Sequence, residues 1–462
     1  MRFMIRQISQ QAKLTDEVLG AAMETVIPQA SIEAVVEEMG VRERRQRKLP
    51  ARVTMALIVA MNLFTYLPLH LVLGKLLWGL RLVWHDPDLL TANKSAICQA
   101  RYRLGARPMV ELFHRVCKPM ATETTPGAFL FGLSLMAIDG TTEDIPDTPQ
   151  NAKVFGRHTA GERGDGAFPQ VKAVYLVECG THAIVDAGFW PCHTSDHAGR
   201  RLLRSVSEGM LLLWDTGLHS FEMASKTRER QAHFLSRVPS FVKLQPIRCL
   251  PDGSYLATLR PDRKSPRRHE QLLVRVIEYT ITDPARVGYG ERHRLMTSLL
   301  DSEQCPALEM VCAYHERWEI ELTIDEADTH QRLSQHPLRS QRPVAVIQEF
   351  YGLLLAHYVV RSIMHDAAIE ANIDPDRLSF RNALEIIRDA IPQFQLVDSS
   401  QHPLLYQRLL RDIARHRLPE RANRINPRVI KRKVLKFPKK RKHHLSWPQP
   451  STPFRCAVAM LN

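Results

Sequence analysis

Cysteine is scarce in this sequence, and no two cysteines have the spacing of common metal-binding or redox motifs. The 462 residues include eight cysteines and no C-x-x-C pair. That spacing is typical of zinc ribbons and thioredoxin-type sites, so both classes are excluded. The simplest interpretation is a reduced, cytoplasmic chain.

Long apolar runs are also rare, and the longest one is interrupted. Met55–Gly74 has no charged residue over twenty positions, but Pro68 lies within it among polar residues. A membrane-spanning helix of this length tolerates few polar groups. We therefore expect two buried helices joined near Pro68 and no membrane partner. The first twenty residues have no sustained apolar core, so no signal peptide is expected.

Acidic residues are missing from the C-terminal end of the chain. From Arg421 to Asn462 there are twelve lysines and arginines and no aspartate or glutamate. The whole chain carries a net charge of +14, which favours polyanionic partners through counterion release. The tail is predicted to be a disordered extension that adds non-specific, salt-sensitive affinity for DNA.

Two apolar segments in the middle of the chain each end on an aspartate. "LFGLSLMAIDG" ends near Asp139, and "LLLWDTG" near Asp215. Both segments predict buried strands, and open α/β sheets bind ligands at the carboxyl ends of their strands. The two residues are therefore candidate catalytic carboxylates, although Asp is also a common turn residue after a strand. Between them, "FPQVKAVYLVECGTHAIVDAGFW" predicts a β-hairpin.

A third candidate acid lies in a later helical segment. Tyr314, Arg317 and Glu321 are spaced three and four residues apart, so one helix would present them on one face. Carboxylates that converge from several elements can hold two Mg²⁺ ions for phosphoryl chemistry. Glu321 would complete such a site, while Arg317 and the Tyr314 hydroxyl would contact a phosphate. The alternative is a surface helix whose charges pair with one another.

The segment "NKSAICQARYRLG" predicts a basic helix that Ser95 opens and Gly105 closes. As the second helix of a helix-turn-helix it would present four side chains to DNA: Lys94, Gln99, Arg101 and Arg103. A solvated face of an ordinary helix explains the same pattern, and the sequence leaves both interpretations open.

The order of these features resembles the DDE transposases, which have an RNase H-like core. "YHERWEIE" matches the signature Y-x2-R-x3-E-x6-K of the insertion-sequence-four family, up to its glutamate. "AIDGTTEDIPDT", "WDTGLHS" and "YGLLLAHYVVR" are similar to further blocks of that family. The resemblance covers roughly residues 30–390.

This resemblance implies an α/β fold: an RNase H-like mixed β-sheet core flanked by helices, with a β-rich insertion and an all-helical N-terminal domain. The expected ranges are a helical DNA-binding domain at 1–125, a catalytic core at 126–239 and 306–370, an insertion at 240–305, and C-terminal helices with the basic tail at 371–462.

The resemblance also implies cut-and-paste transposition of an insertion sequence. Asp139, Asp215 and Glu321 would hold two Mg²⁺ ions, with Mn²⁺ as a substitute. The expected partners are double-stranded DNA, as terminal inverted repeats and target, and a second copy of the chain on paired ends. We expect a cytoplasmic, nucleoid-associated enzyme. The alternatives are a catalytically impaired transposase that only binds DNA, and an RNase H-like nuclease acting on structured DNA.

The sequence departs from the family signature seven residues after Glu321, where Asp328 replaces a lysine. Regular helical spacing would put Asp328 on the face of Glu321, so an anion would face DNA. On this basis Asp328→Lys is expected to raise end cleavage severalfold. Thr216 is a weaker departure, because relatives often have a basic residue there. Nearby, Glu143, Asp144 and Asp147 are predicted to be solvated turn residues.

Overall fold

The computed structural model describes residues 24, 26–43, 49–76, 92–158, 166–262, 264–286, 288–332, 338–418 and 452–461. The chain forms two compact units, and each is built from three separate segments. Unit 1 comprises Met1–Ala128, Ile138–Ser205 and Glu319–Leu418, and unit 2 comprises Phe129–Ala137, Val206–Trp318 and Pro419–Asn462. Among the predicted ranges only the catalytic core, at 126–239 and 306–370, is discontinuous, and these ranges stay a prediction.

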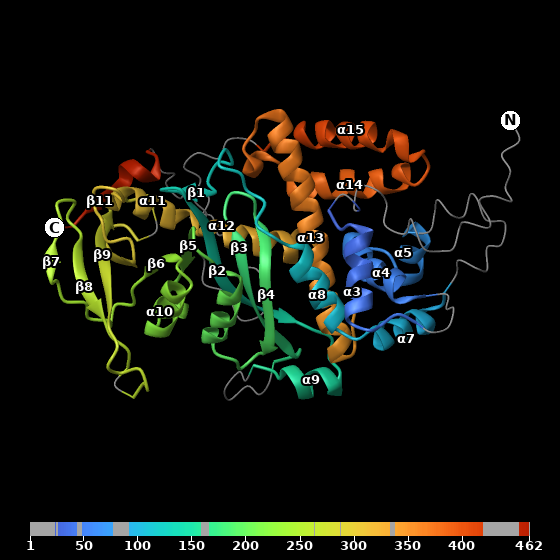
Figure 1. Cartoon of the computed structure of the whole chain (residues 1–462), viewed down its shortest axis with the longest axis horizontal. Helices are drawn as coiled ribbons and strands as arrows, with labels where there is room; N and C mark the ends of the chain where they lie inside the picture. Colours follow the sequence, from blue (N-terminus) through green and yellow to red (C-terminus); the bar gives the residue numbers. More distant parts are fainter. Residues whose placement is uncertain are drawn as a thin grey trace, which may run out of the picture. The chain divides into compact units, whose positions relative to one another are not determined.

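A long apolar helix, α13 (Pro343–Ala371), is the centre of unit 1. Proline is tolerated in its first turn, and Asn372 ends it in the left-handed conformation. Figure 1 shows α13 beside α14 (Phe380–Phe394) and α15 (His402–Ala414), against which it packs. Its length and composition would let it cross a membrane, but 83% of its most apolar window is buried inside the protein.

The N-terminal part of unit 1 is helical, as predicted. The apolar run forms α4 (Ala51–Leu63) and α5 (Leu69–Leu76), which are separate helices on either side of Pro68. Among the described residues this part also contains α3 (Gln29–Glu38), α7 (Lys94–Leu104) and α8 (Arg107–Val116). The cap predicted for α7 is wrong: the side chain of Asn93, not Ser95, accepts a hydrogen bond from Ala96 N at 2.8 Å. Gly105 ends the helix as expected.

The strands of unit 1 are the second half of β2 (Leu133–Asp144), β3 (Gln170–Glu178) and β4 (Ala183–Pro191), in the order β4-β3-β2. The predicted hairpin is confirmed, because β3 and β4 pair in antiparallel fashion. Its turn needs left-handed backbone at Gly180 (φ 80°) and His182 (φ 58°). This turn therefore brings a histidine to one end of the sheet.

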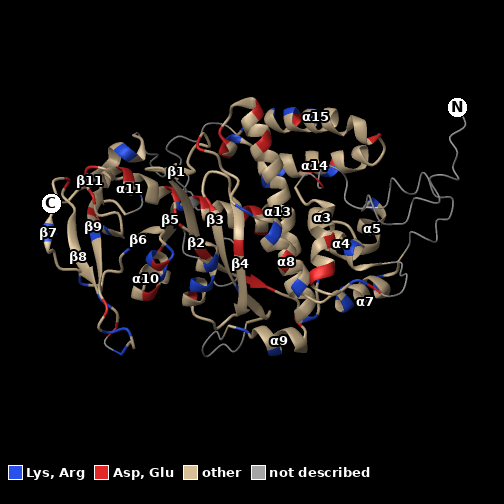
Figure 2. Ribbon diagram, viewed as in Figure 1, with Lys and Arg blue, Asp and Glu red and all other residues tan. Residues whose placement is uncertain are grey.

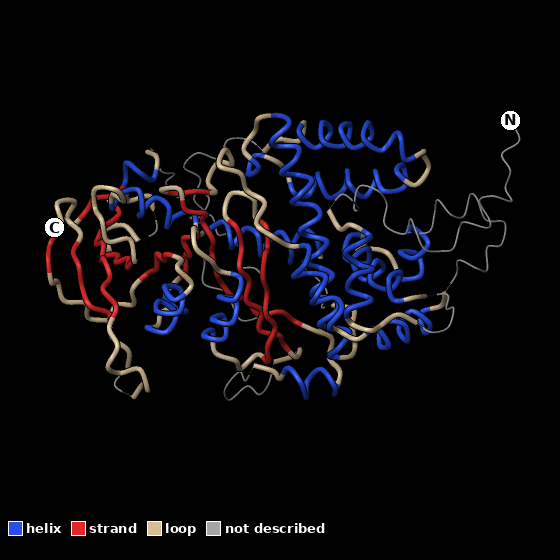
Figure 3. Tube along the Cα trace, viewed as in Figure 1, coloured by secondary structure: helices blue, strands red, loops and turns tan. Residues whose placement is uncertain are grey.

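Unit 2 contains a mixed sheet that begins with the first half of β2. The order is β2-β5-β6-β10-β9-β8-β7, and the β2–β5 and β5–β6 pairs are parallel. Figure 3 draws the strands of this sheet in red. The helices of the unit include α10 (Phe221–Glu229) and α11 (Ala307–Glu316). The strands are β5 (Met210–Trp214), β6 (His233–Arg237), β7 (Arg248–Cys249), β8 (Tyr255–Leu259), β9 (Leu272–Ile281) and β10 (Arg292–Thr297).

Short strands complete this sheet at both ends of the unit's sequence. β1 (Phe129–Leu130) pairs with β2, and β11 (Val458–Met460) pairs with β9. The basic tail predicted to be disordered lies largely outside the described residues. Its last described part, residues 452–461, includes β11 and thus joins the fold.

Candidate active site

Asp139 lies on β2 directly after four fully buried residues, Leu135–Ile138. The run of apolar side chains fixes the strand in the core, and the charge follows where burial decreases. Asp139 is half-buried, and its Oδ1 accepts a hydrogen bond from Gly140 N at 2.7 Å. The strand thus holds this carboxylate in one orientation.

Asp215 follows β5, whose last four residues are buried. Its Oδ1 accepts a hydrogen bond from Gly217 N at 2.8 Å and caps a short 3-10 turn, η4 (Thr216–Leu218). Asp215 therefore does act as a turn residue, which does not prevent it from being functional. In the parallel register of β2 and β5, Ala137 pairs with Leu213. Asp139 and Asp215 each come two residues after one member of that pair.

Tyr314 and Arg317 lie at the end of α11, close to the turn of Asp215. The Tyr314 hydroxyl donates to the carbonyl oxygen of Trp214 at 3.3 Å, one residue before Asp215. The Arg317 guanidinium carbon lies 5.9 Å from the centre of the Tyr314 ring. Burial raises the pKa of Tyr314 well above its ordinary value, so the phenol remains a hydrogen-bond donor at neutral pH.

Glu321 lies in α12 (Trp318–Asp325) and is half-buried. The helix that we predicted over 314–328 is interrupted twice. Arg317 caps α11 before α12 begins, and a π-helix, η5 (Glu326–Gln331), follows α12. A π-turn has a longer hydrogen-bonded ring than an α-turn, so the simple three-and-four spacing does not hold across these residues.

Asp328, which lies in the π-helix, corrects our expectation that its carboxylate would face DNA. Its Oδ1 accepts a hydrogen bond from Arg332 Nη1 at 3.2 Å, and the same nitrogen donates to Glu143 Oε2 at 2.5 Å. Burial and the neighbouring Glu143 raise the pKa of Asp328 well above its ordinary value. Glu143 is itself buried on β2, so the prediction of a solvated turn residue is wrong for this position.

This arrangement predicts that Asp328→Asn stabilises the protein at alkaline pH. A carboxyl whose pKa is raised in the folded state contributes stability at low pH, and that contribution is lost as the pH rises through the folded pKa. Asparagine is neutral and can still accept from Arg332 and donate to Glu143. We expect a higher melting temperature than the wild type at pH 8.5, with the difference shrinking towards pH 5.5.

The matched control is Asp412→Asn, because Asp412 pairs with Arg415 at the surface of the same unit. It should change the melting temperature little at either pH. A pH-independent effect of Asp328→Asn would contradict the pairing with Glu143. Asp328→Lys, by contrast, would put an ammonium beside the Arg332 guanidinium, and we now expect it to lower stability and not to raise cleavage.

The four side chains predicted to reach DNA from α7 are not equivalent. Lys94 and Gln99 are exposed, and Arg103 keeps 36% of its side-chain area exposed while it donates to Leu49 O. Arg101 is only 4% exposed, and its guanidinium donates to Gln348, Ser340 and Ala345. Arg101 therefore holds α7 to the start of α13. Figure 2 draws the Lys and Arg positions of α7 in blue.

A buried group of charged side chains in unit 1 was missed by our reading of the sequence. It consists of His182, Glu319, Glu326, Arg361 and Asp376, and we call it the His182 cluster. Burial and Arg361 oppose protonation of His182, but Asp376 and Glu326 outweigh them and raise its pKa to about 10. These residues have no common spacing along the chain, so no sequence motif could have revealed them.

Comparisons with known proteins agree with this architecture. A family model described as "Insertion element 4 transposase N-terminal" matches residues 19–114, and one described as "Transposase DDE domain" matches residues 130–359. The latter match supports the RNase H-like α/β fold expected from the sequence. It also contains Asp139, Asp215, Tyr314, Arg317 and Glu321.

A relative and a solved structure extend the comparison. The transposase InsG of insertion sequence element IS4 from Escherichia coli K12 is 30% identical over 420 residues, which cover 88% of this chain and 91% of InsG. The piggyBac transposase in a synaptic complex with hairpin DNA is 12% identical and covers 88% of this chain and 86% of its own, with a TM-score of 0.40. From the two family models and the identity to InsG, the chain belongs to the IS4 family of insertion-sequence transposases and is a DDE transposase.

Proposed function

We propose that this transposase moves its own insertion sequence by a cut-and-paste reaction, with Asp139, Asp215 and Glu321 as its catalytic carboxylates. The observation that carries the proposal is the register of β2 and β5. Residues two apart on a strand share a face, and Ala137 pairs with Leu213. Asp215 thus follows the carboxyl end of β5, where open α/β sheets bind their ligands, and Asp139 lies two residues past Ala137 within β2, which continues to Asp144.

The donor chemistry of these residues fits the divalent metal that DDE transposases use. Carboxylate oxygens are the ligands that Mg²⁺ prefers, and neither cysteine nor histidine belongs to the set. Asp139 and Asp215 are each oriented by a backbone N–H, so their orientation does not depend on a mobile rotamer. When bound, two Mg²⁺ ions, or Mn²⁺ in their place, would lower the pKa of the attacking water and stabilise the leaving oxygen.

The neighbouring side chains support a role in holding the DNA backbone. Arg317 would donate a charge-assisted hydrogen bond to a phosphate oxygen. Tyr314 stays protonated, and its bond to Trp214 O keeps the ring under the Arg317 guanidinium. Tyr314 is thus a phosphate-contacting or supporting residue, and the reaction needs no covalent protein nucleophile.

The reaction would consist of two displacements at phosphorus. In the first, water attacks the phosphodiester at each end of the element, the bond to the 3′ oxygen breaks, and a 3′-hydroxyl is freed. In the second, this hydroxyl attacks another phosphodiester in the opposite strand or the target DNA, the bond from that phosphorus to its 3′ oxygen breaks, and the strand that leaves carries the new 3′-hydroxyl. Lys94, Gln99 and Arg103 on α7 would help to bind the terminal inverted repeats, whereas Arg101 is not included because it is buried.

We further propose that two copies of the chain act together on paired ends, in the cytoplasm and in association with the nucleoid. The net charge of +14, most of which lies in the C-terminal tail from Arg421 to Asn462, supports attraction to DNA. No membrane partner is required for any step.

The proposal is tested with a supercoiled plasmid that carries the ends of the element. Incubation with the protein and Mg²⁺ should release the element, and Asp139→Asn should abolish release while gel-shift binding to the ends persists. Binding without nicking by the wild type would identify an impaired, DNA-binding transposase. If unrelated junction DNA inhibits the cleavage by competition, the protein is instead a nuclease that recognises DNA structure.

A further inference from the structure

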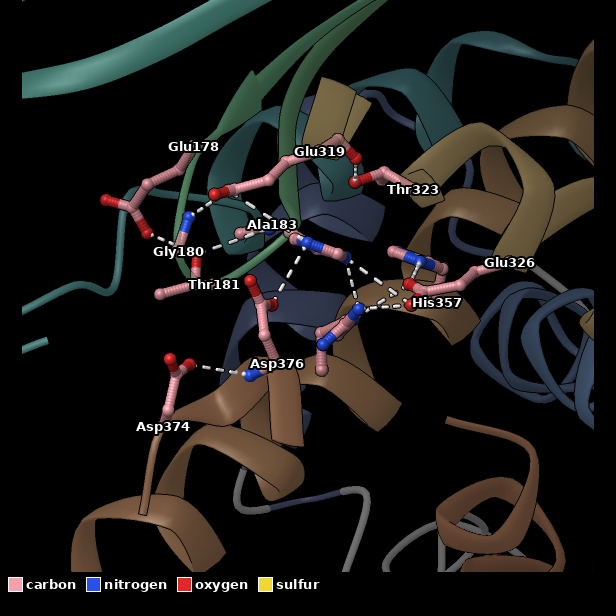
Figure 4. A network of polar contacts seen from close by, with 12 residues as sticks. Glu178, Gly180, Thr181, Ala183, Glu319, Thr323, Glu326, His357, Asp374 and Asp376 are labelled. Atoms are coloured by element: carbon pink, nitrogen blue, oxygen red, sulfur yellow. Dashed lines mark hydrogen bonds and ion pairs between the residues drawn. The ribbon is translucent and has the colours of Figure 1, made fainter. Parts of the chain in front are cut away.

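The His182 cluster is drawn in Figure 4, together with the residues around it. Its members come from distant segments of unit 1: the β3–β4 turn, α12, η5, α13 and a short 3-10 helix, η6 (Pro375–Arg377). In the figure, the side chains of Glu319, Glu326 and Asp376 reach towards a common centre from different elements. Such convergence is unusual for buried acids, because each carboxylate must be balanced by cations or hydrogen bonds.

Two atoms at this centre are buried and lack hydrogen bonds. His182 is only 3% exposed, and its Nε2 lies 3.1 Å from Asp376 Oδ1. The two atoms form an ion pair with each other, but neither has a hydrogen-bond partner of good geometry among the residues that the structure describes. Buried polar atoms of this kind are rare in native proteins, and a bound ion is one of the known explanations.

The spacing of the surrounding ligand atoms is suitable for a metal ion. His182 Nε2 lies 4.0 Å from Glu319 Oε2, and one ligand atom from each of His182, Glu319 and Asp376 lies within 4.8 Å of the others. Two ligands of a tetrahedral zinc ion, each about 2.0–2.1 Å from it, are about 3.4 Å apart. The separations of His182 Nε2 from Asp376 Oδ1, 3.1 Å, and from Glu319 Oε2, 4.0 Å, lie on either side of that value.

The opposite nitrogen of the imidazole has the partner that metal-bound histidines usually have. Glu326 Oε1 lies 3.4 Å from His182 Nδ1, so it can accept the Nδ1 proton and leave Nε2 available as a ligand. Arg361 donates to both oxygens of Glu326, which keeps that carboxylate in place. Its Nη2 also contacts His182 Nδ1, and because a guanidinium can only donate, this contact must lengthen when Nδ1 carries the proton.

The cluster gives a divalent cation negatively charged surroundings. The carboxylates of Glu319, Glu326 and Asp376 converge on His182 and Arg361, and Gly180 N also donates to Glu319 Oε2. A divalent cation on His182 Nε2 would replace a proton there, so the carboxylates would keep a positive partner.

From these observations, we propose that His182, Asp376 and Glu319 form a second metal site, which binds one divalent transition-metal ion such as Zn²⁺ or Mn²⁺. One imidazole and two carboxylates suit these ions better than Mg²⁺ or Ca²⁺, which prefer oxygen ligands alone. The site is structural: it ties α12, the helix of Glu321, to the β3–β4 turn and to η6. It does not depend on the proposed function, because none of its ligands is in the catalytic set.

The experiment uses tag-free, full-length protein in which the catalytic carboxylates are neutralised by Asp139→Asn, Asp215→Asn and Glu321→Gln. This background removes the proposed Mg²⁺ site, so that metal retained by the chain reports on the second site. After treatment with a chelator, the protein is titrated with Zn²⁺ by calorimetry and with Co²⁺ by visible absorption. We expect one equivalent per chain, and Zn²⁺ should raise the melting temperature by mass action.

Substitution of a ligand should abolish this binding. His182→Asn suits the left-handed backbone of position 182, which asparagine tolerates, and it should weaken Zn²⁺ binding at least about 100-fold. Asp376→Asn should have a similar effect. The matched control, His233→Asn, replaces a part-buried histidine of unit 2 that bonds to Ser298, and it should leave binding unchanged.

The outcomes of this experiment do not depend on those of the plasmid assay that tests the proposed function. If the background protein binds no Zn²⁺ or Mn²⁺, and if neither ion changes its melting temperature, the proposed site does not exist. Full retention of binding in His182→Asn would also overturn it. Should that variant fail to fold, the melting temperature of the background protein with and without Zn²⁺ still decides the question.

Discussion

Replacing Asp215 with asparagine is expected to reduce strand cleavage by about 10³-fold or more, because a carboxylate that binds metal supplies several kcal/mol to the transition state. The fold should persist. Asparagine retains an oxygen that can accept the hydrogen bond from Gly217 N, so the cap of η4 is preserved while the charge is lost. The measurement is single-turnover nicking of an end-containing plasmid, together with a melting curve.

The matched control for this variant is Asp262→Asn. Asp262 lies in unit 2 and caps a loop in the same way, since its Oδ1 accepts from Lys264 N at 2.9 Å. It should cleave like the wild type. Equal rates for both variants would show that Asp215 is a turn residue without a catalytic role, and the proposed carboxylate set would then be wrong. If the melting curve of Asp215→Asn shows no cooperative unfolding, a second variant, Asp215→Ser, takes its place, because serine also caps turns.

Replacing Glu326 with glutamine is expected to lower the free energy of unfolding by about 3–5 kcal/mol, the usual cost of removing one partner of a buried ion pair. Glu326 accepts hydrogen bonds from Arg361, at 2.8 Å from its Nε, and lies 3.3 Å from His357 Nε2. Its removal leaves the Arg361 guanidinium buried beside His182. The measurement is chemical denaturation of metal-free protein at pH 7, which keeps this test separate from Zn²⁺ binding.

The pH dependence gives a second readout for Glu326. Burial opposes its ionisation, but Arg361 and His182 outweigh burial and hold the pKa of Glu326 well below its ordinary value. The contribution to stability is therefore present above the unfolded pKa of about 4.3 and is lost as the pH falls. Wild type should lose stability below that pH more steeply than Glu326→Gln.

Glu37→Gln is the control for this substitution, because Glu37 pairs with Arg42 at the surface, with 58% of its side-chain area exposed. An exposed pair contributes at most about 1 kcal/mol. If Glu326→Gln unfolds no more easily than Glu37→Gln, the ion pairs of the His182 cluster do not contribute to stability in the way that their burial implies.

Features that depend on neighbouring residues could be predicted from the sequence. The β3–β4 hairpin and the two helices around Pro68 follow from alternation, a turn and a proline, which are all local signals. The strand end before Asp215 was visible for the same reason, since an apolar run that ends on a charge is a local pattern. The strand end predicted at Asp139 is wrong, because β2 continues to Asp144. The roles of these two residues came from the family resemblance and stay a prediction.

The errors have a common cause, which is that the decisive partner is far away in the sequence. Arg101 looked like a DNA-binding residue, but Gln348 and Ser340 surround it in the folded chain. Asp328 was expected to be an exposed anion, but in the folded chain Arg332 donates to both Asp328 and Glu143. Asp328 also lies in a π-helix, so regular α-helical spacing does not give the direction of its side chain.

The sequence by itself therefore determined the family, the helical and strand-forming segments, and the acids that are candidates for catalysis. Tertiary structure alone decided which charges are buried, because burial is set by residues that meet only after folding. In this protein the consequence is largest at His182, where segments more than a hundred residues apart bring three carboxylates around one imidazole. A buried charge requires a partner, and which partner it finds is a property of the fold.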